Sequence, residues 1–278
     1  MKKIFLVLSI FLAIGTPLLA EEQQQQNEKF QGFNLQGYGD NGKKTWDVNG
    51  DTADIKGSQV TLSNVVANSY GDEKINVTAQ KGTIDQTSGQ MQLEKDVVIT
   101  SEKGTQLMTN SLDWNRKQDL VKTKDDVLIT DDAKGLTASG TGMEAHPGLQ
   151  NAQLKEDVTV RVNTAAAKED PSYVTITSDG PMTLDQAQSM AVFEKNVVAF
   201  QGGKTLKADR MEVYFDNAKS TIKEMICLGN VEIVQGENQT FADKAVYNAT
   251  NQKLTLSGRP KLIMNTQQGK DGASAFGN

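Results

Sequence analysis

The feature that most constrains the fold is a motif that recurs about every 30 residues, a charged turn followed by an alternating apolar strand. It reads EKDVVIT at 94–100 and KDDVLIT at 124–130, and it returns at 155–161, 194–200 and 228–234. Self-similarity at such a period indicates stacked repeats, each of which completes the core of its neighbour. We therefore expect an elongated repeat protein.

Aligning these segments on the Asp or Asn before the apolar pair defines one anchor position per repeat. The anchors are Asn64, Asp96, Asp126, Asp157, Asn196, Asn230 and, in a looser match, Arg259. A second strand-like element precedes most anchors, and Gly, Asn, Asp and Lys separate the elements. Because apolar residues alternate with period two and no window holds a helical period, we predict an all-β fold of short antiparallel strands joined by turns.

The apolar residues of the motif share one face of each strand, because residues two apart point to the same side. The opposite phase is mixed, with Val98 and Leu128 but also Thr159 and Glu232. Packing in an ordinary core is one interpretation of this stripe, and a continuous apolar wall is the other. The candidate residues are Val97, Ile99, Val127, Ile129, Val158, Val160, Val197, Ala199, Val231 and Ile233.

The N-terminus has the features of an export signal. Lys2 and Lys3 precede an apolar run from Ile4, and Ala20 stands before Glu21. We expect a signal peptide at 1–20. An uncleaved N-terminal anchor is the alternative, because the apolar run is close to the length of a membrane-spanning helix.

Charge and cysteine content exclude several classes of function. The chain has 29 Lys and Arg against 35 Asp and Glu, a net charge of −6. Nucleic acid is therefore not expected as a partner, because binding to it needs clustered positive charge. The single cysteine, Cys227, forms no internal disulfide and is expected to be a small buried residue.

No motif supports a catalytic, metal or cofactor site. With His146 as the only histidine, no zinc ligand set and no Ser-His or Cys-His pair can form. GYGDNG at 37–42 lacks the helix that a phosphate-binding loop needs, and DVNGD at 47–51 fails as a calcium loop, so we expect turns at both.

The C-terminal repeats resemble a known family. The stretch from 208 to 263 combines Ala-Asp, Val-Tyr, a turn and Gly-x-Val before a strand, and this resembles the OstA-like repeat of the LptA family of periplasmic lipopolysaccharide-transport proteins. The stretch from 43 to 161, opened by Trp46, is similar to LptC. The resemblance covers roughly residues 38 to 264.

The resemblance implies an open β-jellyroll, or β-taco, whose aliphatic groove shields lipopolysaccharide acyl chains. It implies a periplasmic module that bridges an inner-membrane ABC exporter and an outer-membrane translocon, with possible end-to-end self-association and no cofactor. LptC proteins usually keep an inner-membrane anchor, so the expected cleavable signal is a departure. We expect these divisions: signal or anchor 1–20, disordered spacer 21–37, LptC-like repeats 38–162, linker 163–172, OstA/LptA-like repeats 173–264 and disordered tail 265–278.

Two other classes of function compete with lipid transport. A structural or adhesive β-solenoid would use the same apolar stripe as a closed core. A β-helical enzyme acting on polysaccharides would need clustered acids and aromatic sugar platforms, which the repeats lack. A lipid cross-link to the apolar phase would separate transport from the solenoid.

Overall fold

The structure is a computed structural model, and it describes residues 27–39, 42–71, 73–115, 117–146, 151–163, 173–216, 221–251 and 253–264. In these ranges the chain forms β-strands, and the one helical element is a single 3₁₀ turn, η1 (Asp132–Lys134). The prediction of an all-β fold is confirmed. The expected signal (1–20), most of the linker (164–172) and the tail (265–278) lie outside the described residues.

The strands form one antiparallel sheet of 17 strands. β10 and β11 both pair with β9 and β12, and β16 and β17 both pair with β15, so each of these two pairs occupies a single rung. The strands are β1 (Asn27–Tyr38), β2 (Lys44–Lys56), β3 (Gln59–Tyr70), β4 (Lys74–Asp85), β5 (Gln90–Ser101), β6 (Gln106–Asn115), β7 (Leu120–Asp131), β8 (Leu136–His146), β9 (Asn151–Asn163), β10 (Tyr173–Ser178), β11 (Met182–Asp185), β12 (Met190–Gln201), β13 (Lys204–Asp216), β14 (Thr221–Gln235), β15 (Asn238–Asn248), β16 (Lys253–Ser257) and β17 (Lys261–Ile263).

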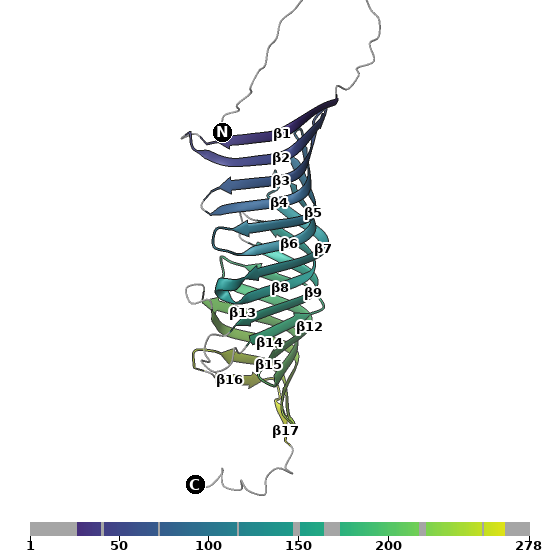
Figure 1. Ribbon diagram of the computed structural model, residues 1–278. Helices are drawn as coiled ribbons and strands as arrows, with labels where there is room; N and C mark the ends of the chain where they lie inside the picture. Colours follow the sequence, from purple (N-terminus) through teal and green to yellow (C-terminus); the bar gives the residue numbers. More distant parts are fainter. Residues whose placement is uncertain are drawn as a thin grey trace, which may run out of the picture.

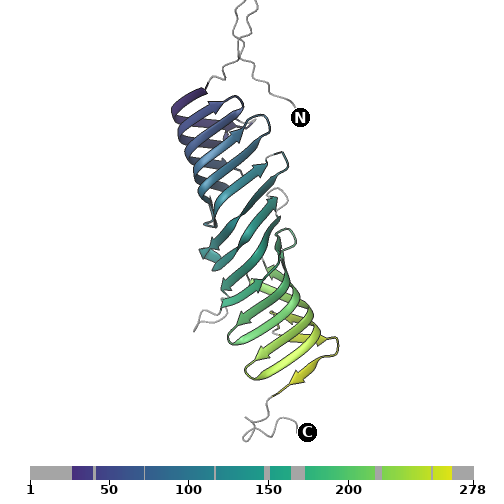
Figure 2. The ribbon, with the colours of Figure 1, turned by 90° about the vertical axis from the view of Figure 1, so that its right-hand side faces the viewer.

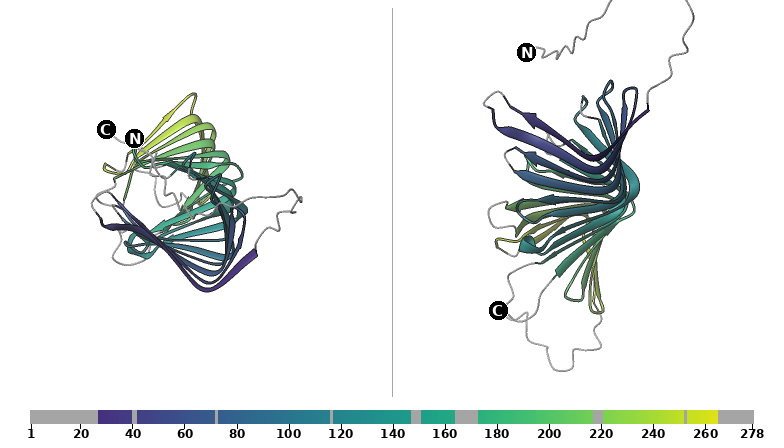
Figure 3. Two further views of the ribbon diagram at one scale, coloured as in Figure 1. Left: turned by 90° about the horizontal axis from the view of Figure 1, so that it is seen from above. Right: turned by 45° about the horizontal axis from the view of Figure 1, so that its top comes forward.

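The rungs are stacked along one long axis, with β1 at one end and β17 at the other (Figure 1). Each rung bends near its middle, so the sheet is folded into a V-shaped trough, and the rungs fan out around the axis (Figures 2 and 3). We call the bend the corner. Arm 1 is the half of each rung that ends at the turns following β1, β3, β5, β7, β12 and β14, and arm 2 is the other half.

The anchor residues form the corner. Six of the seven have positive φ, from 45° at Asn230 to 52° at Asp96 and Arg259, and Asp126 is the exception. Asn and Asp tolerate this left-handed conformation better than most residues. The pairing register also shifts next to most anchors, for example between Glu94 and Val97, and such β-bulges bend a strand.

Hydrogen bonds between side chains of neighbouring rungs hold the corner. Asn64 donates to Asp51 at 2.7 Å, and Asn230 donates to Asp209 at 2.9 Å. Thr141 likewise donates to the anchor Asp126 at 2.8 Å. The motif predicted as a turn between short strands is therefore a clamped bend inside strands that mostly run for 10 to 15 residues.

The repeat of about 30 residues is one antiparallel pair of rungs. The anchors lie on β3, β5, β7, β9, β12, β14 and the rung of β16 and β17, and each second element lies on the strand between two anchored rungs. Two 12-residue strands with their turns, such as β4 and β5, account for the period.

Two expectations from the sequence are wrong, and a third agrees with the structure. Residues 27–37 belong to β1, so the spacer expected at 21–37 is wrong in this part. DVNGD at 47–51 lies inside β2 and is not a turn. GYGDNG is where β1 ends and β2 begins, and the backbone N–H of Gly42 donates to Gly39, as expected for a turn.

The sheet is continuous across the expected linker. Tyr173 of β10 pairs with Asn163 of β9, and the register runs on to Ser178 and Val158. The sequence left open whether the two halves share one sheet, and the structure shows that they do.

Candidate functional site

The inner surface of arm 1 carries one row of apolar side chains that crosses every rung. Each member is the register partner of the next, so neighbouring members are about 5 Å apart along the trough. Thr240 is the polar exception. The arm 1 row consists of Leu35, Val48, Ala67, Val77, Ile99, Leu107, Ile129, Ala138, Val160, Ile176, Ala199, Leu206, Ile233, Thr240 and Leu262.

Arm 2 carries two further rows, which are apolar except at Gly82 and Thr123. Next to the corner lies the arm 2 row: Ala53, Leu62, Gly82, Leu93, Leu112, Thr123, Met143, Leu154, Met182, Phe193, Met211, Cys227, Ala245 and Leu256. Nearer the open edge lies the rim row: Ile55, Val60, Ile84, Met91, Trp114, Val121, Ala145, Ala152, Leu184, Ala191, Val213, Met225, Tyr247 and Leu254.

All ten residues predicted from the motif lie on the inner surface. Ile99, Ile129, Val160, Ala199 and Ile233 belong to the arm 1 row. Their partners in the motif lie at the corner and are almost fully buried, with at most 2 % of their surface exposed: Val97, Val127, Val158, Val197 and Val231.

The residues predicted from the motif make up only a small part of the inner surface. The intervening strands contribute Leu107 and Leu206 to the arm 1 row, and both lie in the second, looser elements. Both arm 2 rows were missed, because they lie on the far side of the corner from the motif. Alternation read backwards from each anchor would have found Leu93 and Met91.

Exposure of the arm 1 row changes along the trough. Its members on β3 to β7 are half-buried, and we call this stretch the open segment. Its members on β8 to β12 are buried, between 2 % exposed at Ile176 and 8 % at Val160, and we call this stretch the closed segment. Leu206 and Ile233, on β13 and β14, are again half-buried.

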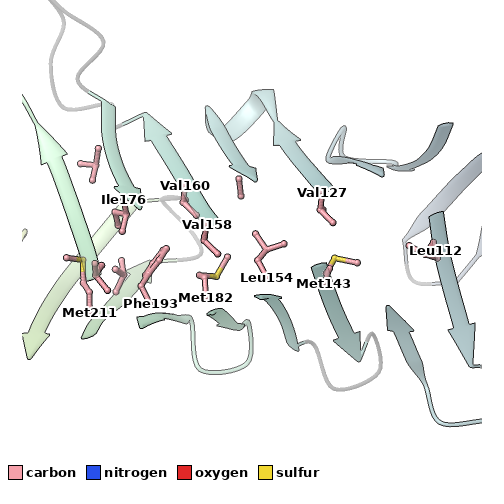
Figure 4. Close-up of a cluster of buried hydrophobic side chains, with 14 of the residues drawn as sticks. Leu112, Val127, Met143, Leu154, Val158, Val160, Ile176, Met182, Phe193 and Met211 are labelled. Carbon is pink, nitrogen blue, oxygen red and sulfur yellow. The ribbon is translucent and has the colours of Figure 1, made fainter. Parts of the chain in front are cut away.

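Large side chains fill the closed segment. Met143, Leu154, Met182 and Phe193 of the arm 2 row are between 2 % and 8 % exposed. Figure 4 shows them in a line across the interior, with Val160 and Ile176 from the other side of the trough. They belong to the hydrophobic cluster that runs along the trough, and in this stretch the arm 1 residues Ala138, Val160, Ile176 and Ala199 are buried members of the same cluster.

A separate hollow of about 670 Å³ lies on the outer side of the corner. It is lined by Val98, Met108 and Leu128, which are register partners on the side of the sheet opposite to the arm 1 row. Asp96 and Asp126 also line it. Leu128 is 38 % exposed. The corner residues Val97 and Val127 also line this hollow.

A polar cluster holds the outer surface of arm 1 near β1. Asp47 is buried and accepts hydrogen bonds from Lys44 at 2.5 Å, Asn68 at 2.8 Å and Tyr70 at 2.9 Å. The hydrogen bond from Asn68, with those from Lys44 and Tyr70, lowers the pKa of Asp47 to about 2. The charge is thus stabilised within the sheet surface, and the cluster ties β2 to β3.

A second buried carboxylate lies at the rim of arm 1. Asp131 caps η1 by accepting from the backbone N–H of Lys134 at 3.1 Å, and it also accepts from Thr105 at 2.9 Å. Burial acts to raise the pKa of Asp131, but the hydrogen bonds from Lys134 and Thr105 outweigh it, so the pKa is lowered. Both carboxylates therefore have structural partners.

The described residues hold no group of His, Cys, Asp and Glu that could bind a metal ion. Cys227 is buried, and burial raises its pKa to about 12, so it is a thiol at neutral pH. Among the described residues, no helix is long and apolar enough to span a membrane. The chemistry offered by the trough is burial of apolar surface.

Comparison with known proteins gives the family. The family model described as "Lipopolysaccharide-assembly, LptC-related" matches residues 5–163, and that of "LptA/(LptD N-terminal domain) LPS transport protein" matches residues 175–275. No curated protein matches the chain. Among solved structures it is similar to LptH, the LptA homologous periplasmic component of the lipopolysaccharide transport device of Pseudomonas aeruginosa, with 13 % identity over 69 % of this chain and 94 % of that chain and a TM-score of 0.20. Since the first family model spans more than half of the 278 residues, the chain belongs to the LptC-related family of lipopolysaccharide-assembly proteins, and its C-terminal part matches the LptA model.

Proposed function

We propose that this protein is a periplasmic lipopolysaccharide-binding transport module, in which the arm 1 row shields acyl chains. The observation that carries this proposal is the arm 1 row, which is apolar on fourteen of fifteen rungs and only partly buried over much of its length. Ile99, Leu107 and Ile129 are partly buried on three consecutive rungs, so they offer a continuous strip of apolar surface that a lipid could cover.

The row suits an elongated lipid. Burial of apolar surface contributes about 25 cal/mol per Å², so affinity grows with the number of rungs that an acyl chain covers. Because every member of the row is apolar and partly buried from β3 to β7, an acyl chain shifted by one rung within the open segment meets similar contacts. This uniformity favours movement along the trough over capture in one deep pocket.

The two ends of the sheet suit the bridging role. In the described residues β1 pairs only with β2, and β17 pairs only with β15, so both present unpaired backbone groups. Leu35 is 46 % exposed and Leu262 is 59 % exposed at these ends. An open strand edge is suited to adding a strand from a partner, such as the exporter, the outer-membrane translocon or a second copy.

The strand suited to docking at the N-terminal end is β1 and not the segment from Trp46 to Ile55. That segment lies in β2, which already pairs on both sides with β1 and β3. At the C-terminal end the segment from Lys261 to Met264 contains the edge strand β17, as expected. A proline at Leu35 or at Ile263 removes a backbone donor from an edge strand and should weaken co-purification with the partner at that end. Full retention by both variants would contradict docking through these edges.

Lipid binding is tested by photo-cross-linking at two adjacent residues. Ile129 lies on the inner row, whereas Leu128 faces outward and is 38 % exposed. A benzophenone amino acid at position 129 should cross-link purified lipopolysaccharide, and one at position 128 should not. Because Leu128 is exposed and apolar, it controls for non-specific adsorption.

The alternative is a structural solenoid with a closed core, and the buried corner, the buried arm 2 row and the closed segment fit it. It predicts no cross-link at position 129. Cross-linking that is equal at both positions, or found at neither, would overturn the transport proposal.

A further inference from the structure

We infer that the closed segment is a gate across the path of acyl chains, and that Phe193 is the side chain that sets its closure. The inference rests on the proposed function. It adds that the trough holds two accessible stretches separated by side chains that a passing acyl chain must displace.

The first observation is the exposure profile. Leu107 and Ile129, before the gate, and Leu206 and Ile233, beyond it, are half-buried. Between them every member of the arm 1 row is buried. All these residues belong to one continuous row. An acyl chain that lies on this row in the open segment therefore meets a barrier at β8.

The second observation is the kind of residue that forms the barrier. On β8 to β12 the arm 2 row places Met143, Leu154, Met182 and Phe193, while the arm 1 row places Ala138, Val160, Ile176 and Ala199. Large side chains on one arm thus meet smaller ones on the other. Methionine is unbranched and adapts its shape readily, so this packing can yield without movement of the sheet.

The third observation is the local backbone. Met182 lies on β11, which has only four residues, and the rung is interrupted between Ser178 and Met182. The backbone N–H of Gly180 donates to Glu194 at 3.2 Å, a bond outside the regular strand pairing. The gate therefore includes a rung whose regular strand is interrupted, and irregular backbone hydrogen bonds at Asp179, Gly180 and Pro181 join this interruption to β12.

The fourth observation is its place in the chain. The LptC-related match ends at residue 163 and the LptA match begins at residue 175, and these positions fall on β9 and β10. An acyl chain that moves from the first part to the second must cross the closed segment. The gate thus controls passage between the two matched parts.

The test maps where an acyl chain contacts the full-length protein. A palmitic acid probe that carries a diazirine is cross-linked to the purified protein, and the modified peptides are identified by mass spectrometry. In the unmodified protein, labelling of β8 to β12 should be about a tenth of that on β4 to β7, because a filled apolar interior leaves no room for the probe. Phe193→Ala should raise labelling of β8 to β12 about fivefold, since an apolar cavity takes up apolar ligands.

Phe200→Ala is the matched control, because Phe200 lies on the same strand but faces outward and is 51 % exposed. It should leave the pattern unchanged. Phe193→Leu, which keeps most of the packing, should give a smaller increase if Phe193→Ala does not fold. Labelling spread evenly over β4 to β14 in the unmodified protein, or no increase in a folded Phe193 variant, would overturn the gate and leave lipid binding intact. Absence of labelling on the inner rows altogether would overturn the proposed function, and the gate with it.

Discussion

Ile129 and Val160 occupy the same position in successive repeats, three residues after their anchors, yet they differ in exposure. Ile129, in the open segment, is half-buried, whereas Val160, in the closed segment, is 8 % exposed. The cause lies on the opposite arm. In the arm 2 row the strand of Ile129, β7, carries the small Thr123, whereas the strand of Val160, β9, carries the larger Leu154.

The comparison teaches that the motif fixes which side of the sheet a residue faces, but not whether that side is accessible. The side of the sheet toward which a residue points is set by alternation along one strand. Accessibility is set by the volume of side chains that come from the other arm, which lies beyond the corner in sequence.

The largest expected effect comes from placing a carboxylate in each segment. Val160→Asp puts a charge at the position equivalent to Ile129, but one that is only 8 % exposed, and it should destabilise the protein by about 4 kcal/mol or more, because a buried charge without a partner is among the most costly changes. Ile129→Asp should cost about 1 to 2 kcal/mol, since the half-buried site leaves the carboxylate in contact with water. Chemical denaturation of both variants measures the difference.

The folded Ile129→Asp protein should also lose binding of lipopolysaccharide, because the carboxylate must be desolvated when an acyl chain covers it. Circular dichroism confirms the intact sheet before binding is compared. Equal destabilisation by the two changes would show that the open segment is as closed as the other.

The next effect compares two phenylalanines of β12. Phe193 is 2 % exposed and Phe200 is 51 % exposed. Phe193→Ala should lower the free energy of unfolding by about 3 to 5 kcal/mol, and Phe200→Ala by about 0.5 kcal/mol or less. A loss below about 1 kcal/mol for Phe193→Ala would mean that the closed segment is loosely packed, contrary to the comparison.

Much of the fold was readable in the sequence. The anchors, the apolar phase and the period of about 30 residues gave an all-β stack, because alternation and left-handed Asn or Asp are local properties. The bend at the anchor was not predicted, since a residue such as Asp96 has the same signature in a hairpin turn and in a corner.

The strand β1 was missed for a related reason. Phe30 and Phe33 are three positions apart, so they do not fit an apolar pattern with period two. The cause is Gly32, whose φ of 72° shifts the alternation of the strand by one residue. The closed segment could not be predicted from the sequence, because its burial depends on residues of both arms and no local sequence pattern connects them.

A smaller effect tests the support of the open segment from its outer side. Asp47 has its pKa lowered from 3.8 to about 2, so the folded protein favours the ionised form. Its contribution to stability is full above pH 3.8 and is lost as the pH falls through about 2. Asp47→Asn should therefore cost about 2 kcal/mol at neutral pH and almost nothing near pH 2.

The measurement is the difference in unfolding free energy between the two proteins as a function of pH, which cancels the titration of other acids. Hydrogen exchange should show the added opening on β2 and β3 and not on β8 to β12, because the partners of Asp47 lie on β2 and β3. A difference that does not change with pH would contradict the assigned role of the charge.

The smallest effect concerns the two arms of a single rung. On β14, Ile233 of the arm 1 row is half-buried, while Cys227 of the arm 2 row is 1 % exposed with a pKa of about 12. If the trough is open only on its arm 1 side, the thiol should react with Ellman's reagent at pH 8 at least about a thousandfold more slowly than in denaturant, because it is both covered and protonated. Cys227→Ala should cost about 1 kcal/mol and leave lipopolysaccharide binding unchanged, since the change removes one small buried group from a wall that no acyl chain reaches. Fast reaction in the native protein, or weakened binding with the sheet intact, would show that arm 2 opens as well, and the distinction between accessible and packed rows would then fail within the same rung.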